Sequence, residues 1–228
     1  MEIADAATHM PAILVVKGRP HFLFCIGIQQ VWWKSYYTLL DGSTPPRRIG
    51  FNNGPRINEC SPDGYEDEAG NLHLSITQEY RLVHYTGASL DRLEQVEDFG
   101  PCISGTVLPD RYIICRTTGA DVLVFSRDHV HIDTITAEAL GLKGLRLVRI
   151  TFLCEDPDFL VFTGTDGGRD RSTLYQQSTR RAWKITRNGN GIYKCTIYKG
   201  VLYYARRASA MIDDRVLVMT SNFELTPI

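Results

Sequence analysis

Short runs of alternating apolar and polar residues follow one another along the chain, and each run ends at a turn rich in glycine, proline, aspartate or asparagine. The clearest example lies between Asn58 and Val96. There the segments NECSP, NLHLSITQ, RLVHYTG and LDRLEQV are separated by turns, among them Asp67 to Gly70 and a second turn at Glu79. Alternation with a period of two is typical of half-buried strands. This stretch therefore predicts a four-stranded antiparallel meander.

The same pattern occurs five times. The second strands align as HFLFCIG, NLHLSIT, RYIICRT, DFLVFTG and GVLYYAR, which begin at residues 21, 71, 111, 158 and 200. A step of about 40–50 residues is typical of one four-stranded propeller blade. Third strands are expected from residues 31, 81, 121, 172 and 215, followed by the more polar fourth segments RRIGF, LDRLEQV, VHIDTIT, RAWKITR and FELTPI. The segment TAEALGL, 136–142, predicts one helical turn inside a connection.

These repeats predict an all-β fold, a five-bladed β-propeller of four-stranded antiparallel blades, in which stacked sheets bury one another's faces. A β-sandwich is the alternative, and the regular spacing disfavours it. We expect one domain, 1–228, with an N-terminal tail or closing strand, 1–10, and blades at approximately 11–52, 56–98, 101–136, 145–188 and 191–228.

Aromatic residues gather in the first and last units. Trp32, Trp33, Tyr36 and Tyr37 alternate along one expected strand, and the fifth unit contributes Tyr198, Tyr203 and Tyr204. The first and last blades are neighbours in a closed ring. One pair of the alternating side chains is expected to pack between blades, and the other pair is left open as an exposed interface. An aromatic seam where the ring closes is a further interpretation of the same residues.

Composition narrows the class of partner. The net charge of −1 and the pI of about 6.6 do not favour nucleic acid or an anionic membrane as a partner. No apolar run approaches the roughly 20 residues of a membrane-spanning helix, and the N-terminal residues do not have the pattern of a signal peptide. Six widely spaced cysteines are expected to be buried free thiols. We expect synthesis in a reducing cytoplasm, with incorporation into a particle left open.

The acidic turn segment GYEDEAGNLHLSI in unit two and the S-x-D pattern of Ser126 to Asp128 resemble, loosely, the blades of sialidase-like Asp-box propellers and of five-bladed glycosidase propellers. Trp183 alone supplies the tryptophan of that motif, so no copy is complete. The resemblance implies a propeller fold and a connection with carbohydrate.

Loops between second and third strands, and between blades, should gather on one face as a polar rim. Arginine forks and carboxylates there can bind a sugar or the polar surface of another protein. The expected ligand- or partner-binding residues are Arg56, Asn58, Glu79, Arg81, Arg116, Asp166, Arg169, Arg171 and Arg206. Pairing among these loop charges is the structural alternative.

Catalysis has weaker support in the sequence. Glycoside hydrolysis needs two carboxylates across the scissile bond, and resembling families carry acids on the inner strands of the first three blades. Here AILVVKG, 12–18, has none, unit two offers Asp63, Glu66 and Asp67, and unit three offers Asp110. A sialidase could use Arg56, Arg149 and Tyr65. The histidines form no metal motif, GTDGGRD precedes no helix, and we expect no metal and no cofactor.

The sequence therefore predicts a non-enzymatic binding or structural propeller that presents a polar rim to a protein or a glycan. A component of a larger assembly, such as a virus particle, is one setting considered for it. The alternative hypothesis is a glycoside hydrolase or sialidase-like enzyme acting on a carbohydrate.

Overall fold

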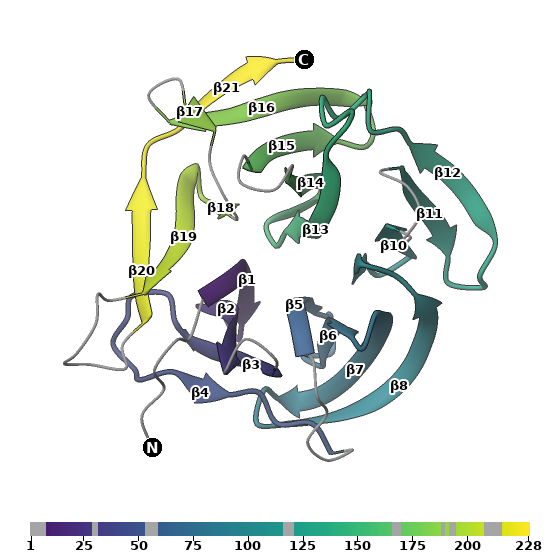
Figure 1. Cartoon of the computed structure of the whole chain (residues 1–228). Helices are drawn as coiled ribbons and strands as arrows, with labels where there is room; N and C mark the ends of the chain where they lie inside the picture. Colours follow the sequence, from purple (N-terminus) through teal and green to yellow (C-terminus); the bar gives the residue numbers. More distant parts are fainter. Residues whose placement is uncertain are drawn as a thin grey trace.

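The computed structural model describes residues 8–28, 32–52, 59–115, 121–165, 170–187, 190–191, 195–207 and 216–228. Within these residues all regular structure is β-strand, and the strands form antiparallel sheets around a central axis (Figure 1). The alternation seen in the sequence therefore predicted the class of secondary structure correctly. No helix in the described part is long and apolar enough to cross a membrane.

Three of the sheets have four strands in the order in which they occur in the chain. The first contains β1 (Thr8–Val16), β2 (Arg19–Ile28), β3 (Trp32–Leu39) and β4 (Arg47–Arg48). The second contains β5 (Glu59–Glu66), β6 (Leu72–Gln78), β7 (Arg81–Ser89) and β8 (Arg92–Pro101). The third contains β9 (Ser104–Val107), β10 (Arg111–Cys115), β11 (Val122–Ser126) and β12 (His131–Ile135).

The last two sheets depart from this plan. The fourth contains β13 (Arg146–Leu153), β14 (Asp156–Thr165), β15 (Asp170–Gln176), β16 (Arg181–Arg187), β17 (Asn190–Gly191) and β21 (Glu224–Pro227). The fifth contains β18 (Cys195–Tyr198), β19 (Val201–Arg207) and β20 (Val216–Ser221).

The prediction of five four-stranded blades is therefore wrong, since the described structure has four blades of four or more strands beside a three-stranded sheet. The reason is the last strand. The segment FELTPI was expected to complete the fifth blade, but β21 pairs with β16 of the fourth, from Thr186 with Glu224 to Trp183 with Pro227. An edge strand accepts any neighbour that can satisfy its backbone groups.

Two other boundaries also moved. Thr8 and His9 pair with β2, so this part of the predicted tail belongs to the first strand; residues 1–7 lie outside the described part. The expected fourth strand RRIGF is shortened to β4, because the chain then crosses to the second sheet, where the amide of Gly50 donates to Leu90 at 2.9 Å. A Cβ on Gly50 would lie 1.8 Å from the carbonyl oxygen of Asp91, so only glycine fits this crossing.

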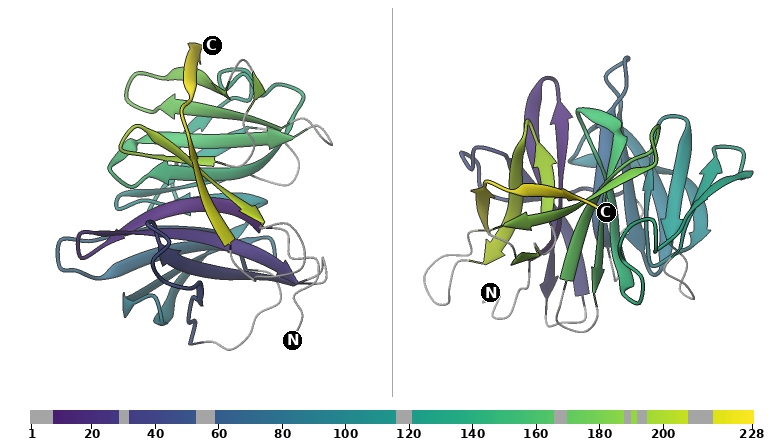
Figure 2. Two further views of the ribbon diagram at one scale, coloured as in Figure 1. Left: turned by 90° about the vertical axis from the view of Figure 1, so that its left-hand side faces the viewer. Right: turned by 90° about the horizontal axis from the view of Figure 1, so that it is seen from above.

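The first strand of each sheet lies nearest the axis, and later strands lie progressively outward (Figure 1). The side views show the strands of the sheets running from one face of the ring to the other (Figure 2). In this arrangement the β6–β7 turn shares a face with the described connections between sheets, β8–β9 and β12–β13. The turns between first and second strands lie on the opposite face.

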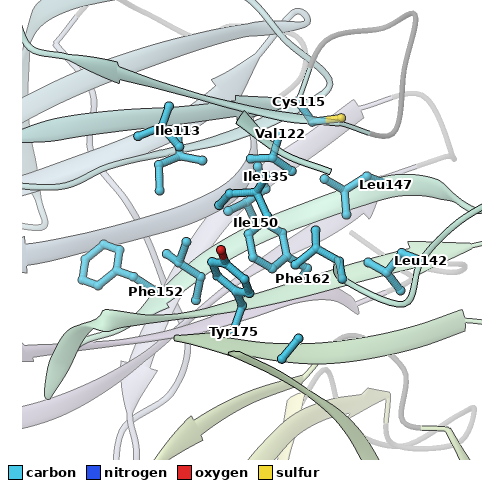
Figure 3. Packing of buried hydrophobic residues seen from close by; sticks show 14 of the residues in the cluster. Ile113, Cys115, Val122, Ile135, Leu142, Leu147, Ile150, Phe152, Phe162 and Tyr175 are labelled. Atoms are coloured by element: carbon cyan, nitrogen blue, oxygen red, sulfur yellow. The ribbon is translucent and has the colours of Figure 1, made fainter. Parts of the chain in front are cut away.

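Buried apolar side chains lie between neighbouring sheets. The largest cluster joins the third and fourth sheets, where Ile113 and Val122 meet Leu147, Ile150 and Phe162 (Figure 3). Other clusters fill the remaining sheet-to-sheet contacts. Because each sheet is covered on both faces, the ring holds itself together through apolar burial.

Part of the predicted aromatic seam is present between the first and fifth sheets, and the side chains of Trp32, Trp33 and Tyr204 lie outside the described part. Phe22, Phe24 and Tyr36 of the first sheet pack with Tyr198 and Tyr203 of the fifth. Tyr37 points to the other side and packs between the first and second sheets. Successive residues of β3 therefore serve two different contacts, as alternation requires.

Candidate functional site

The predicted rim is only partly within the described residues. Arg56, Asn58, Arg116, Asp166 and Arg169 lie outside the described part, and Arg206 is placed in β19 by its backbone. Glu79, Arg81 and Arg171 are described and exposed. The structure thus places these three on the ring and leaves their role in binding as a prediction.

The turn between β6 and β7 is the best-described part of the rim. Glu79 and Tyr80 both have positive φ, 49° and 61°, a conformation that residues other than glycine seldom adopt. Arg81 donates from Nε to Asp98 Oδ2 at 2.7 Å, and the Tyr80 carbonyl accepts the Cys102 amide at 2.7 Å. Tyr80 itself is 65% exposed, more than any other large apolar or aromatic side chain in the described residues. The turn is anchored at its base and presents an aromatic side chain to solvent.

A second candidate lies at the centre of the ring. Asp63 on β5 is completely buried, and its Oδ2 accepts from Thr106 Oγ1 at 2.8 Å and from the Phe152 amide at 3.1 Å. These donors belong to β9 and β13, so one carboxylate connects the inner strands of three sheets. Burial raises the pKa of Asp63 to about 6, although Arg149 and the hydrogen bonds favour the ionised form.

Arg149, on β13, is also completely buried, and its three guanidinium nitrogens have no hydrogen-bond partner. Burial lowers its pKa to about 10, while Asp63 favours the charged form, so the guanidinium is charged at neutral pH. The two charges attract each other, but no hydrogen bond joins them.

Local backbone irregularities bring these side chains to the centre. The register of β5 with β6 shifts between Cys60 and Asp63, and that of β13 with β14 shifts between Leu147 and Arg149. A β-bulge turns the following side chain away from the regular alternation. Asp63 and Arg149 each end such a shift, which explains why the inner strands direct polar groups into the core.

Small polar side chains complete the centre. Ser104 Oγ accepts the Ile150 amide at 2.9 Å, and Ser75 Oγ donates to the Asp63 carbonyl at 3.2 Å. The Cys195 thiol lies near Arg149, and burial raises its pKa to about 11. The axial centre is therefore polar and closely hydrogen-bonded, with Arg149 as the exception.

A third polar cluster crosses the second and third sheets toward the opposite face. His73 links Asp67 and His84, with ring-nitrogen distances of 3.2 Å to the carboxylate and 3.1 Å to the second imidazole. Burial, then Arg127 and His73, lowers the pKa of His84 to about 3, so this imidazole is neutral. From His84 the series of side-chain contacts continues through Arg127, Glu97, His129 and Tyr112. Sequence reasoning missed this cluster, because only strand register brings His73 and His84 together.

The carboxylate pair needed for glycoside hydrolysis is not found in the described residues. Asp63 is the only fully buried acid among them, and the charge facing it is an arginine. Glu66 instead accepts the Lys17 amide at 2.6 Å at the turn after β1. Of the sialidase-type set, Arg56 lies outside the described part, Tyr65 stacks on His73 at 4.7 Å, and Arg149 has no hydrogen bond to Tyr65.

None of the six cysteines, all of which lie in the described part, forms a disulfide bond, and four of them are buried. Among the described residues, no group of three or more histidine, cysteine or acidic side chains is placed to hold a metal ion.

Comparison with known proteins places this architecture among propellers. The chain is similar to the structure of a putative TolB from Agrobacterium tumefaciens, with a TM-score of 0.50 and 13% identity over 97% of this chain and 81% of that one. It is similar to TolB from Acinetobacter baumannii, with a TM-score of 0.50 and 12% identity over 98% of this chain and 55% of that one. No family model and no curated protein matches the chain.

At this identity the likeness concerns the fold alone: an all-β, propeller-like arrangement of antiparallel sheets. The resemblance to sialidase-like and glycosidase propellers, drawn from the acidic turn of unit two, is not supported by these comparisons. That turn is explained locally, since Asp67 accepts hydrogen bonds from Asn71 and contacts His73.

Proposed function

We propose that this protein is a non-enzymatic binding propeller whose rim, on the face of the β6–β7 turn, binds a protein partner. The observation that carries the proposal is Tyr80, 65% exposed between the charged residues Glu79 and Arg81. Tyrosine and arginine are enriched in protein interfaces, where an aromatic side chain supplies apolar area and its charged neighbours supply orientation.

The conformation of the turn supports this assignment. A tyrosine in the left-handed region is strained, and such residues persist only where the surrounding structure or a function compensates. Here the base of the turn is held by the Arg81–Asp98 ion pair and by the bond to Cys102. The backbone that carries the aromatic side chain is thus preorganised, which lowers the entropic cost of binding.

The rest of the rim would surround this anchor. We include Arg56, Asn58, Arg116, Asp166, Arg169, Arg171 and Arg206 as proposed contacts, because the sequence predicts that loops between second and third strands and between blades gather on one face. A multi-subunit assembly such as a virus particle would be one setting for an adaptor of this kind. A glycan, alone or on the partner, is the other ligand class to test.

The test compares two single substitutions at exposed apolar residues. Tyr80→Ala changes the rim, whereas Val130→Ala changes a residue that is 59% exposed at the β11–β12 turn, on the opposite face. A partner recovered stoichiometrically from the native source should be purified and titrated by calorimetry against the wild type and both variants. We expect Tyr80→Ala to weaken binding by roughly 30-fold or more, in the range of an interface hot spot, and Val130→Ala to leave it unchanged.

Equal affinity of the wild type and Tyr80→Ala would contradict the rim assignment. Binding to a glycan array without a protein partner would favour the carbohydrate reading. If the wild type hydrolysed chromogenic glycosides and Asp63→Asn did not, the glycosidase alternative would be supported, although no second buried carboxylate is found in the described residues. Circular dichroism of each variant should confirm that the fold is retained.

A further inference from the structure

Arg149 has the largest fully buried side chain of the described residues, and it is charged. None of its guanidinium nitrogens donates a hydrogen bond within the protein. A guanidinium offers five N–H donors, and leaving them unmatched in a buried site is strongly unfavourable. The centre of the ring therefore contains an unsatisfied cationic donor group.

The nearby carboxylate does not satisfy this demand. Asp63 Oδ2 accepts from Thr106 and from the Phe152 amide, and Oδ1 accepts from the Gly64 amide at 3.1 Å. Thr151 also favours the ionised carboxylate through a hydrogen bond, whereas no guanidinium nitrogen of Arg149 donates to Asp63, which therefore acts on Arg149 through longer-range attraction. The bulges at both residues hold this arrangement in place.

We propose that the guanidinium of Arg149 binds a small monovalent anion at the axis of the ring, with a halide as the simplest representative. The guanidinium carries one positive charge, and its charged neighbour Asp63, with a pKa of about 6, becomes neutral when protonated, so one compact negative charge then balances the guanidinium. This site is separate from the rim proposed for the partner.

Binding should be coupled to protonation of Asp63. An anion on Arg149 disfavours the ionised carboxylate, so the anion enters together with a proton. Besides Arg149, the titratable group that faces Asp63 is the Cys154 thiol, and Arg149 faces the Cys25 and Cys195 thiols. Burial raises the pKa of Cys154 to about 12 and that of Cys195 to about 11, so these two thiols stay neutral near pH 6.

Halide affinity should therefore depend on pH in a defined way. Asp63 without the anion titrates at about pH 6. Above pH 6, the halide affinity should fall by about tenfold per pH unit, because binding of the anion requires the uptake of one proton. Below pH 6, the halide affinity should become independent of pH. Asp63→Asn retains the guanidinium but removes the titration, so its halide affinity should be independent of pH.

The experiment uses the full chain and sodium bromide. Thermal unfolding is followed at pH 5.5 and pH 7.5 in bromide and in gluconate at equal ionic strength, for the wild type, Arg149→Met and Asp63→Asn. We expect bromide to raise the Tm of the wild type at pH 5.5 and less at pH 7.5, to raise that of Asp63→Asn equally at both, and to have no specific effect on Arg149→Met. Anomalous diffraction from bromide-soaked wild-type crystals should place a bromide against the Arg149 guanidinium.

Crystals that bind bromide at their surface but hold none beside Arg149 at pH 5.5 would overturn the proposal. So would equal Tm values of the wild type in bromide and gluconate at both pH values. If Arg149→Met does not fold, the wild type, Asp63→Asn and the diffraction experiment still decide the question. Loss of partner binding in Tyr80→Ala bears on the rim alone.

Discussion

Replacing Asp63 by asparagine should change how the stability of the protein depends on pH. The buried carboxyl of Asp63 has its pKa raised from the ordinary 3.8 to about 6, chiefly by desolvation. Between these two values the folded state holds a proton that the unfolded state releases. The free energy of unfolding therefore gains a contribution as the pH falls from 6 toward 3.8, and this contribution is absent above pH 6, where both states are ionised.

The size of the effect follows from the shift. One pKa unit corresponds to about 1.4 kcal/mol, so the full contribution is about 3 kcal/mol, of which about 2 kcal/mol is present at pH 4.5. Asparagine has nearly the shape of the protonated acid and does not titrate. The stability of the wild type minus that of Asp63→Asn should therefore increase by about 2 kcal/mol from pH 7.5 to pH 4.5.

The assay is urea unfolding at several pH values in gluconate buffers, since guanidinium chloride would introduce a halide. Asp128→Asn, at an exposed position, controls for the removal of one carboxylate. The difference between the wild type and Asp63→Asn cancels contributions from other titrating groups. If that difference stays constant within about 0.5 kcal/mol across the range, the raised pKa of Asp63 and the axial electrostatics derived from it are refuted.

Three further predictions follow from other parts of the ring. The pKa of His84 is lowered to about 3, so below pH 6.5 the unfolded state takes up a proton that the folded state does not bind. In urea titrations, His84→Gln should therefore remove about 3 kcal/mol of the destabilisation that the wild type shows at pH 4.5. If the unfolding free energies of the variant and the wild type depended on pH in the same way, this prediction would be contradicted. Phe162→Ala should lower the free energy of unfolding by about 3–5 kcal/mol, because the side chain of Phe162 is fully buried. Val130→Ala, at an exposed position, should lower it by less than about 0.5 kcal/mol. Similar losses for the two variants would show that the core is misassigned. Deleting residues 224–228 should speed amide hydrogen exchange at Trp183–Thr186 of β16, and unchanged protection there would mean that β21 does not pair as described.

Much of the fold could be predicted from local pattern. The second and third strands of all five repeats were located, because residues that alternate between two buried or half-buried faces carry that period whatever their partners are. The part of the aromatic seam formed by Tyr36, Tyr198 and Tyr203 was also predictable, since the first and last units of a ring must meet. The single turn at 136–142 lies in the connection before β13, where Leu140 donates to Thr136 at 3.2 Å.

The candidate sites were less accessible to the same reasoning. Asp63 was noted as an acid of the second unit and Arg149 as one of several arginines, but their meeting at the axis depends on two bulges. A one-residue shift in a strand reverses which face a side chain occupies, and no period marks such a shift in advance. The Asp67–His73–His84 chain depends in the same way on the register between β6 and β7.

The sequence by itself determined the all-β class, the repeat length and most strand positions, because alternation and turn residues act over a few neighbouring positions. Only the tertiary structure decided that β21 joins β16 and leaves the fifth sheet with three described strands, and that Arg149 is buried without a hydrogen bond. Both depend on contacts between segments that are tens of residues apart. The free energies that decide them come from unpaired sheet edges and from buried charged groups, which exist only once the ring has formed.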